Sequence, residues 1–461
     1  MTMPPHHGME LSGKAVLVVG LGLSGLGAAR FCAARGARVT VNDIRGEEPL
    51  AATLAQLPDG VRVVLGSHPE EVFRSAELIV LSPGVPPLPA LDQARSAGVE
   101  IIGEIELAAR HLQGQLIAVT GTNGKSTTTS WIGEMLAGLG RPLFVGGNLG
   151  EPLIGAAGTQ AAGPDGIAVA ELSSFQLETC TTLRPRVALL LNLAEDHLDR
   201  YAGMDEYIAA KARIFAAQTA DDWAVINGDQ PACLAVAEGI AARVARFSTT
   251  ARMDPGASLV DDALCIRLPG VPRMRLSTRS IRLVGRHNLE NAMAAILAAA
   301  LAGATAAQIQ AALDQFGGLP HRMQHVGEHD GVRFFNDSKA TNVSAVVGSL
   351  TGFPGGYVLV AGGRHKGAPY TPLRPVLGAV RAVILIGEAA DLLAEDLYGV
   401  APLHRAKTLE EAVRLGAKLA QAGEAVVLSP ACSSYDMFTN YERRGEAFAA
   451  AVARLEKGGD A

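Results

Sequence analysis

The chain has 461 residues, 48% of them hydrophobic and 19% charged, and a formal net charge of −6 at pH 7. This length exceeds what one hydrophobic core supports, and the composition excludes a disordered chain, so we expect two to four globular domains. No long run of basic residues occurs, which gives no reason to expect nucleic acid or an anionic membrane surface as a partner.

The cysteines and the N-terminal region indicate a cytoplasmic protein. Five cysteines are scattered without a Cys-x-x-Cys pair, a pattern typical of reduced thiols: Cys32, Cys180, Cys233, Cys265 and Cys432. The apolar stretch that starts at Ala15 is interrupted by glycines and ends at Arg30. It therefore predicts a strand and the start of a helix, and we expect neither a secretory signal nor membrane insertion.

The first α/β block runs from about Leu11 to about Glu104 and carries a glycine motif. Short β-branched runs at 15–19, 38–41 and 78–81 alternate with Ala-rich helical stretches. Gly20-Leu-Gly-Leu-Ser-Gly25 follows the first run, and Asp43 ends the second, at about the distance expected of a ribose-binding carboxylate. NAD or FAD binding is the obvious interpretation. Another nucleotide could use the same helix N-terminus, and a structural glycine turn is a further alternative.

The second block opens at Gln115 with a phosphate-binding pattern. The apolar run 115–119 is followed by Gly121-Thr-Asn-Gly-Lys-Ser-Thr127 and by a helical stretch. Such a turn aims backbone N–H groups at one point, where Lys125 adds a cation and the Ser126 hydroxyl a ligand for Mg²⁺. Val119 stands where the strict P-loop pattern has glycine, so the match is to a shorter variant. The alternative is a tight turn with a surface lysine.

Further polar groups follow later strands of this block. Glu171 ends the apolar run 166–170, where an acid that holds Mg²⁺ is expected. Glu195, Asp196, His197 and Asp199 follow the run 187–191, and His197 could ligate a metal with Asp196 orienting it. Lys211 lies in a helical stretch and by itself would be a solvated lysine. The stretch 254–282 predicts hairpins and the stretch 288–302 a helix, before a linker at 317–320.

The third block holds expected strands at 332–335, 357–360, 382–386 and 425–428. Three polar loops follow three of these strands, at 336–342, 362–367 and 429–435. The carboxyl ends of parallel strands meet at one edge of a sheet, so three such loops favour a site over three independent turns. Alternation of strand and helix throughout the chain predicts α/β domains with doubly wound, mostly parallel sheets.

With these residues assembled, the chain resembles the Mur ligases of bacterial cell-wall synthesis, most closely the type that adds D-glutamate. The resemblance covers essentially the whole chain. It rests on these segments: 121–126, Gly147-Asn148, Glu171-Leu-Ser-Ser-Phe-Gln176, Glu195-Asp-His197, Lys211, His287-Asn288, His321-Arg322, Asn336-Asp-Ser-Lys-Ala-Thr-Asn342 and Leu428-Ser-Pro-Ala-Cys432. It implies three Rossmann-like domains: a UDP-binding domain at 1–108, a central P-loop-type ATPase domain at 109–318 and an amino-acid-binding domain at 319–461.

The resemblance also implies roles for individual residues. ATP would meet Gly121, Thr122, Asn123, Gly124, Lys125, Ser126, Thr127, Asn288, Asn291, Arg322 and Asp337. The UDP-sugar would meet Gly22, Leu23, Ser24, Asp43, Ile44, Arg45, Ser82, Gly84, Asn148, Ser173, Gln176 and His197. D-Glutamate would meet Lys339, Thr341, Lys366, Ser434, Tyr435 and Tyr441. Two Mg²⁺ ions would use Ser126, Glu171, His197 and Lys211, the last carbamylated by CO₂, because a carbamate is an oxygen ligand and an ammonium is not.

The implied activity is an ATP-dependent amide ligase that joins D-glutamate to UDP-N-acetylmuramoyl-L-alanine through an acyl phosphate, with Lys125, His197 and Lys211 as catalytic residues and a monomeric enzyme. Tyr441, Ser433 and Tyr435 depart from the residues familiar at their positions. The rivals are a ligase that adds glutamate to folate, a dinucleotide-dependent oxidoreductase and a nucleotide-gated switch. The folate-type ligase lacks a domain for uridine. An oxidoreductase would leave Lys125 and the C-terminal block of this chain unexplained, and a switch would leave the residues suited to Mg²⁺ unexplained.

Overall fold

The computed structural model describes residues 8–198, 200–279, 281–283 and 285–456. By their contacts, the residues divide into two compact units. The first unit comprises Met1–Leu193, Tyr207–Ile281 and Leu289–Phe316, and the second comprises Ala194–Glu206, Arg282–Asn288 and Gly317–Ala461. The first unit holds two sheets and the second unit holds one.

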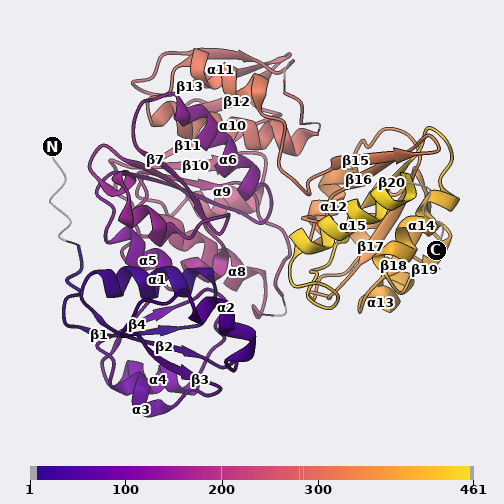
Figure 1. Ribbon diagram of the computed structural model, residues 1–461. Coiled ribbons are helices and arrows are strands. Elements are labelled where there is room, and N and C mark those ends of the chain that lie inside the picture. The colour runs from indigo at the N-terminus through magenta and orange to yellow at the C-terminus, as the bar shows by residue number, and fades with distance from the viewer. Residues whose placement is uncertain (1–7, 199, 280, 284, 457–461) are drawn as a thin grey trace. The chain divides into compact units, whose positions relative to one another are not determined.

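The N-terminal sheet has five parallel strands in the order β3-β2-β1-β4-β5. Their bounds are β1 Ala15–Val19, β2 Arg38–Asp43, β3 Arg62–Leu65, β4 Leu78–Leu81 and β5 Glu100–Gly103. Helices α1 (Leu23–Ala34) and α5 (Glu104–Ala109) pack on one face, and α3 (Glu70–Arg74) and α4 (Pro89–Ser96) on the other (Figure 1). The direction of winding reverses between β1 and β4, which is where a doubly wound sheet opens a ligand crevice.

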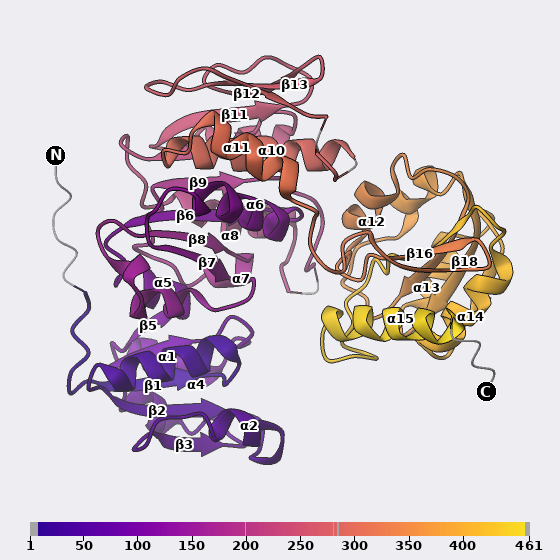
Figure 2. The same cartoon turned by 45° about the horizontal axis from the view of Figure 1, so that its top comes forward.

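The central sheet has nine strands in the order β14-β13-β12-β11-β10-β9-β6-β8-β7. Their bounds are β6 Gln115–Thr120, β7 Leu143–Gly147, β8 Ile167–Glu171, β9 Val187–Leu190, β10 Trp223–Asn227, β11 Arg243–Ser248, β12 Gly256–Val260, β13 Ala263–Arg267 and β14 Met274–Ser277. The strands are parallel up to β12, and β13 and β14 form the hairpins predicted from the sequence. Helix α6 (Lys125–Ala137) packs on β6, β7 and β8, and α11 (Ala306–Gln315) packs on α6 (Figure 2).

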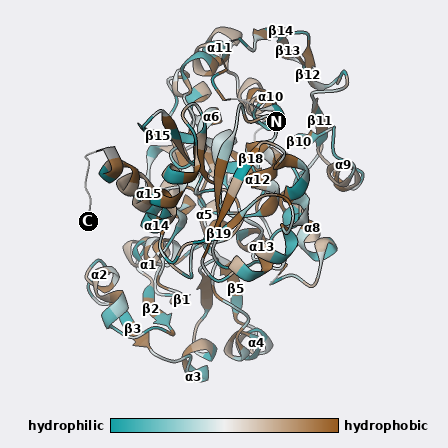
Figure 3. Ribbon diagram, turned by 90° about the vertical axis from the view of Figure 1, so that its right-hand side faces the viewer, coloured by the Kyte–Doolittle hydropathy of each residue, from teal (hydrophilic) through white to brown (hydrophobic). Residues whose placement is uncertain are grey.

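The C-terminal sheet has six strands in the order β15-β16-β20-β17-β18-β19. Their bounds are β15 Gln324–His329, β16 Val332–Asn336, β17 Tyr357–Gly362, β18 Val380–Ile386, β19 Leu403–Arg405 and β20 Ala425–Leu428. Only β15 pairs antiparallel. Helices α12 (Val343–Leu350) and α13 (Ala390–Asp396) bury one face, and α14 (Leu409–Leu419) and α15 (Tyr441–Glu456) bury the other. The hydrophobic colouring of the central strands in Figure 3 follows from this burial on both faces.

The expectation of three α/β domains with mostly parallel sheets is confirmed. Strands β1, β4 and β20 have the bounds that were expected from the sequence. The strands that the sequence analysis did not single out include β3, β5, β7, β15 and β19, which lie at sheet edges, and β10 and β11, which lie inside the central sheet. An edge strand has only one strand neighbour and buries less, so its apolar pattern is weaker.

Candidate active site and nucleotide cavity

The phosphate loop joins β6 to α6 and is held open by glycine geometry. Gly121 and Gly124 have φ angles of 150° and 82°, which disfavour any residue with a Cβ. Gly124 is the N-cap of α6 and has no side chain that could cap the helix, so it offers no side-chain partner to the first amides of the helix. A Cβ on Gly124 would lie 2.2 Å from Asn291 Oδ1, on α10 (Arg286–Leu301). The structure thus brings a predicted ATP residue against this loop.

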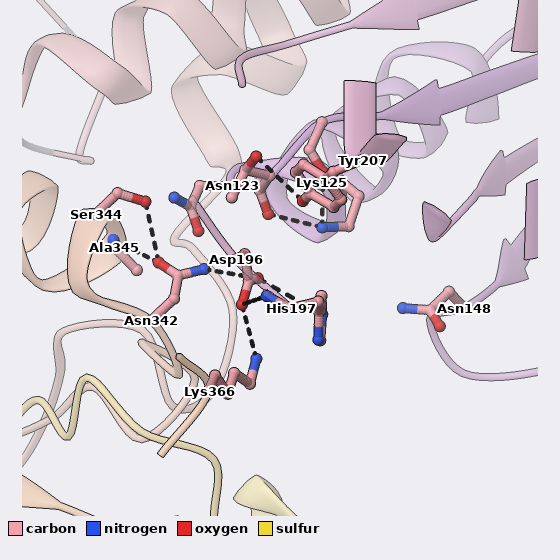
Figure 4. A network of polar contacts seen from close by, with 12 residues as sticks. Asn123, Lys125, Asn148, Asp196, His197, Tyr207, Asn342, Ser344, Ala345 and Lys366 are labelled. Carbon is pink, nitrogen blue, oxygen red and sulfur yellow. Dashed lines mark hydrogen bonds and ion pairs between the residues drawn. The ribbon is translucent and has the colours of Figure 1, made fainter. Parts of the chain in front are cut away.

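Two lysines converge on the same loop carbonyl. Lys125 Nζ donates to the Gly121 and Thr122 carbonyls at 3.0 and 2.8 Å (Figure 4). Lys211, on α8 (Met204–Ala212), is 2% exposed and donates from Nζ to the Gly121 carbonyl at 2.9 Å. Its ammonium also lies 4.6 Å from the centre of the Tyr207 ring. Lys211 is therefore part of the phosphate loop's surroundings, and not the solvated lysine that its helix alone suggested.

Asn192 braces the phosphate loop from the end of β9. Its side-chain oxygen accepts from the Asn123 amide at 2.8 Å, and its side-chain nitrogen donates to the Asn123 carbonyl at 3.0 Å. Its carbonyl accepts from the Thr122 amide at 2.9 Å. The sequence analysis did not assign Asn192 a role, because an asparagine after a strand has no distinguishing pattern.

Glu171 and Asn148 meet at the ends of adjacent strands. Glu171 ends β8 and pairs with Val119 of β6 and Gly147 of β7 in the sheet register. Asn148 Nδ2 donates to Glu171 Oε1 at 2.8 Å, and the Asn148 amide donates to the Glu171 carbonyl at 2.8 Å. Register alone therefore places the Glu171 carboxylate one strand from the phosphate loop, as predicted.

A cavity of about 500 Å³ opens at the switch point of the N-terminal sheet. Its lining includes nearly all residues predicted for the UDP-sugar: Gly22, Leu23, Ser24, Asp43, Ile44, Arg45, Ser82, Gly84, Asn148 and Gln176. Ser173 and His197, the other two residues predicted for the UDP-sugar, do not line it. Ser173 instead caps α7 (Ser174–Leu177), where Gln176 completes the capping box. Leu23 and Ile44 are 72% and 60% exposed. Two exposed aliphatic side chains at such a cavity suit an apolar ring face.

Asp43 shapes the polar side of this cavity. It accepts hydrogen bonds from the Leu21 amide at 2.8 Å and from Arg45 Nη2 at 2.7 Å. Burial would raise the pKa of Asp43, but the Arg45 side chain and the two amides of Leu21 and Arg45 outweigh it and lower that pKa to about 2. The carboxylate is thus ionised at neutral pH, and it fixes the Arg45 guanidinium beside the cavity.

In the second unit, Asp196 is the centre of a polar network. Lys366 Nζ donates to Asp196 Oδ1 at 3.1 Å and Asn342 Nδ2 to Oδ2 at 3.0 Å, while His197 Nε2 lies 3.6 Å from Oδ2 (Figure 4). Burial raises the pKa of Asp196, but Lys366, His197 and Asn342 together hold it below its usual range. His197 has a φ of 56°, and Asp199 lies outside the described residues.

The three polar loops of the C-terminal sheet do converge, as predicted. Arg364 and Ser433 form an isolated bridge that joins the loop after β17 to the loop after β20. Buried Arg444 donates to the carbonyls of Ser338, Cys432 and Ser433 at 2.9, 3.1 and 3.2 Å, which ties the third loop to the other two. The sequence analysis missed Arg444, which belongs to no motif and lies in α15, 106 residues after Ser338.

The residues predicted for glutamate lie in or beside these loops. Lys339 Nζ is 4.9 Å from the centre of the Tyr441 ring, Ser434 is buried, and Tyr435 is 65% exposed. Asp337, which was predicted to meet ATP, is buried and accepts from Ser429 Oγ at 2.7 Å. Burial raises the pKa of Asp337 to about 6, although nearby Arg322 and hydrogen bonds oppose that shift. Contact of Asp337, Arg322 and Asn288 with a nucleotide stays a prediction.

Comparison with known proteins decides the family. The Mur ligase middle domain matches residues 119–299, the MurD-like N-terminal domain matches 14–103, and the Mur ligase glutamate ligase domain matches 321–432. The UDP-N-acetylmuramoylalanine–D-glutamate ligase of Geobacter metallireducens is 48% identical over 98% of this chain and 99% of its own. The ligase of the same name from Geotalea uraniireducens is 48% identical over 98% of this chain and 99% of its own length. This chain belongs to the Mur ligase family.

Solved structures of other Mur ligases share the fold at low identity. A pseudomurein peptide ligase type C from Methanothermus fervidus has a TM-score of 0.60 and 18% identity over 97% of this chain and 100% of its own. MurF from Acinetobacter baumannii has a TM-score of 0.60 and 18% identity over 97% of this chain and 92% of its own. None of the helices in the described parts of this Mur ligase has the length and apolarity that crossing a bilayer requires.

Mur ligases use ATP and Mg²⁺, and the donors at the phosphate loop fit the metal in part. Ser126 is buried in the first turn of α6, and Glu171 ends the neighbouring β8, so both supply the hard oxygens that Mg²⁺ prefers. Among the described residues, no group of three or more His, Cys, Asp or Glu side chains is arranged so that it could hold a metal ion. A Mg²⁺ site at the phosphate loop therefore needs oxygen ligands beyond these side chains. Lys211 is not such a ligand while its side chain is an ammonium.

Proposed function

We propose that this Mur ligase forms the amide between D-glutamate and UDP-N-acetylmuramoyl-L-alanine in peptidoglycan precursor synthesis, and converts ATP to ADP and phosphate. The observation that carries the substrate assignment is the 48% identity, spread over 98% of the chain, to relatives named for that reaction. The cavity beside Asp43 and the phosphate loop beside Lys125 supply two separate nucleotide sites, as a UDP-sugar and ATP require.

The proposed assignment divides the substrates among three domains with boundaries at 1–108, 109–318 and 319–461. The UDP moiety lies in the cavity, with Leu23 and Ile44 against the base and the N-terminus of α1 facing the diphosphate. The ATP phosphates take the place of the Gly121 and Thr122 carbonyls as partners of the Lys125 ammonium. The loops that Arg444 ties together hold the glutamate.

The chemistry runs in two steps. The alanine carboxylate attacks the γ-phosphorus of ATP in line, ADP leaves, and an acyl phosphate forms, while Lys125 offsets charge on the transferred group. Mg²⁺, when bound, neutralises phosphate charge beside Ser126 and Glu171. The glutamate amine then attacks the acyl carbon, inorganic phosphate leaves, and the amine loses one proton. His197, Asp196 and a phosphate oxygen are the candidates for accepting that proton.

Three finer assignments complete the proposal. Lys211 works as a carbamate, because its amine is buried beside the phosphate loop and CO₂ would convert it into an anionic oxygen donor for a second Mg²⁺, together with His197. Lys366, Thr341 and Ser434 bind the two carboxylates of D-glutamate, with Lys339, Tyr435 and Tyr441 beside them. The enzyme acts as a cytoplasmic monomer.

The test is product formation from UDP-N-acetylmuramoyl-L-alanine and ATP with D-glutamate, L-glutamate, D-aspartate and D-glutamine in parallel. A site built for two carboxylates leaves buried donors unpaired with glutamine, which costs up to about 10⁴–10⁵ in specificity in the best-built sites. D-Glutamate should therefore be turned over much faster than the other three. Faster turnover of L-glutamate or of a non-acidic amino acid would refute the assignment of D-glutamate as the substrate, but the protein would still be an amide ligase.

A further inference from the structure

His68 lines the nucleotide cavity from the short loop between β3 and α3. Its ring lies edge-on to the buried Phe73 ring, with the two centroids 5.9 Å apart and the planes at 90°. Its Nδ1 lies 2.6 Å from Oδ1 of Asn42. The imidazole is thus held by an aromatic ring and by one of its own nitrogens, and such a fixed orientation is what a binding residue requires. The sequence analysis gave it no role, because it belongs to no motif.

Asn42 decides which nitrogen of His68 carries the hydrogen. It is fully buried in β2, and its Nδ2 donates to the carbonyls of Val64 and Ser67 at 3.0 and 2.8 Å. These two bonds use both hydrogens of the amide nitrogen, so the amide oxygen faces His68. The opposite orientation of the amide would set its oxygen against two carbonyl oxygens. Because an amide oxygen only accepts, His68 Nδ1 is the donor in the contact with Asn42.

The fixed tautomer determines what His68 offers to a ligand. When Nδ1 of a neutral imidazole carries the hydrogen, Nε2 is a hydrogen-bond acceptor. The described residues provide no hydrogen-bond donor for this nitrogen. His68 therefore presents one acceptor at the cavity, and its complement is a ligand group that donates a hydrogen bond.

The strand order indicates which part of a nucleotide lies near His68. In a doubly wound sheet, the loop after the first strand holds the phosphates, and a carboxylate at the end of the second strand lies at the ribose. The loop at 20–25 and Asp43 occupy these positions. Strand β3 lies beyond β2 at the sheet edge, so the loop with His68 is one strand further from the phosphates, where the base lies. The sugar lies at the other end of the ligand, towards the lining residues Asn148 and Gln176.

We propose that His68 is a specificity-determining residue that recognises uracil, by accepting a hydrogen bond at Nε2 from the N3–H of the base. The inference rests on the proposed function of the cavity. Uracil has a hydrogen on N3, whereas N3 of cytosine has none and only accepts. The amino group of cytosine stands where uracil has O4, so it does not replace the N3 hydrogen. Cytosine would therefore leave two acceptors face to face, and His68 selects UDP over CDP.

The experiment is calorimetric titration of the parent, His68→Phe and Leu23→Ala with UDP and with CDP at pH 8, which favours the neutral imidazole. An unpaired buried acceptor costs about 10–100-fold in affinity, so the parent should prefer UDP by roughly that factor. His68→Phe keeps a ring against Phe73 and removes both nitrogens. It should bind UDP more weakly than the parent does and CDP no more weakly, so that the preference falls close to one.

Leu23→Ala is the matched control, because Leu23 is an exposed aliphatic side chain of the same cavity and makes no distinction between the edges of the two bases. It should weaken UDP and CDP alike and keep the preference of the parent. His68→Gln is a second variant, since a glutamine amide can turn either its oxygen or its nitrogen towards the base. It should bind UDP nearly as the parent does, and CDP more tightly than the parent does.

An unchanged preference for UDP in His68→Phe would overturn the proposal, because another group would then recognise the base. Equal weakening of UDP and CDP in that variant would overturn it too, and would place His68 at the ribose. The CDP affinity of His68→Phe also reports whether its cavity is folded. A parent that binds neither nucleotide refutes the function of the cavity itself, whereas a parent that binds both equally refutes the role of His68 alone.

Discussion

Replacement of Glu104, the buried first residue of α5, by glutamine should change how the stability of the first unit depends on pH. Burial raises the pKa of Glu104 from 4.5 to about 7, while the bonds from Ile154 and Ser24 limit the shift. An acid whose pKa is raised by folding binds more protons in the folded state than in the unfolded state. The contribution of Glu104 to the free energy of unfolding is therefore complete below pH 4.5 and is lost as the pH rises through 7. From those two values, the loss between pH 5 and 8 is about 2.5 kcal/mol. Glutamine does not titrate, so the Glu104→Gln variant does not lose this stability as the pH rises.

The assay is urea unfolding of the parent and of Glu104→Gln between pH 5 and 8, followed by tryptophan fluorescence. Both tryptophans of the chain, Trp131 and Trp223, lie in the first unit with Glu104, so the signal reports on the relevant unit. The variant should gain about 2.5 kcal/mol over the parent as pH rises from 5 to 8. Hydrogen bonds from Thr182 and its neighbours hold the pKa of Glu106 below its usual range despite burial, so its contribution to stability is lost only below pH 4.5, and Glu106→Gln should differ from the parent by a constant amount between pH 5 and 8. A difference between Glu104→Gln and parent that stays constant with pH would refute the reasoning.

Three further outcomes are expected at the active site. Lys125→Ala should lower the rate of phosphate release by about 10²–10³ with both substrates present and leave the melting temperature near that of the parent, and an unchanged rate would exclude its phosphate role. Lys211→Ala should be inactive and partly rescued by short carboxylates, whereas full activity in CO₂-depleted buffer would rule out the carbamate. Lys366→Met should raise KM for D-glutamate by roughly 10–100-fold, as expected for a charged hydrogen bond, with KM for ATP unchanged; equal changes in both would contradict the assignment.

The sequence predicted those parts of the site that depend on local geometry. The glycines at 121 and 124 and the lysine that follows define a phosphate loop in any parallel sheet, and the structure places them at a strand-to-helix turn. The convergence of the three C-terminal loops also followed from strand order, because parallel strands end at one edge. The glycine motif at 20–25 left NAD and UDP open, since a helix N-terminus accepts either phosphate.

The residues that the sequence did not reveal act across long separations. Arg444 binds carbonyls of two loops, one of them 106 residues away, and Asn192 braces a loop 69 residues away. Glu104 and Glu106 stand two apart on one helix, and only their tertiary partners distinguish a carboxyl group bound by one amide from one that anchors the loop at 181–183. Burial and partner identity arise from packing, which no local pattern encodes.

The most direct test of the ligase chemistry is the fate of oxygen from the alanine carboxylate. The substrate UDP-N-acetylmuramoyl-L-alanine is labelled with ¹⁸O in both carboxylate oxygens and turned over with ATP and D-glutamate, and the released phosphate is analysed by mass spectrometry. An acyl phosphate transfers one carboxylate oxygen to phosphorus, so each phosphate should carry one ¹⁸O and the new amide should keep the other. Phosphate without ¹⁸O, released at the rate of product formation, would contradict the account.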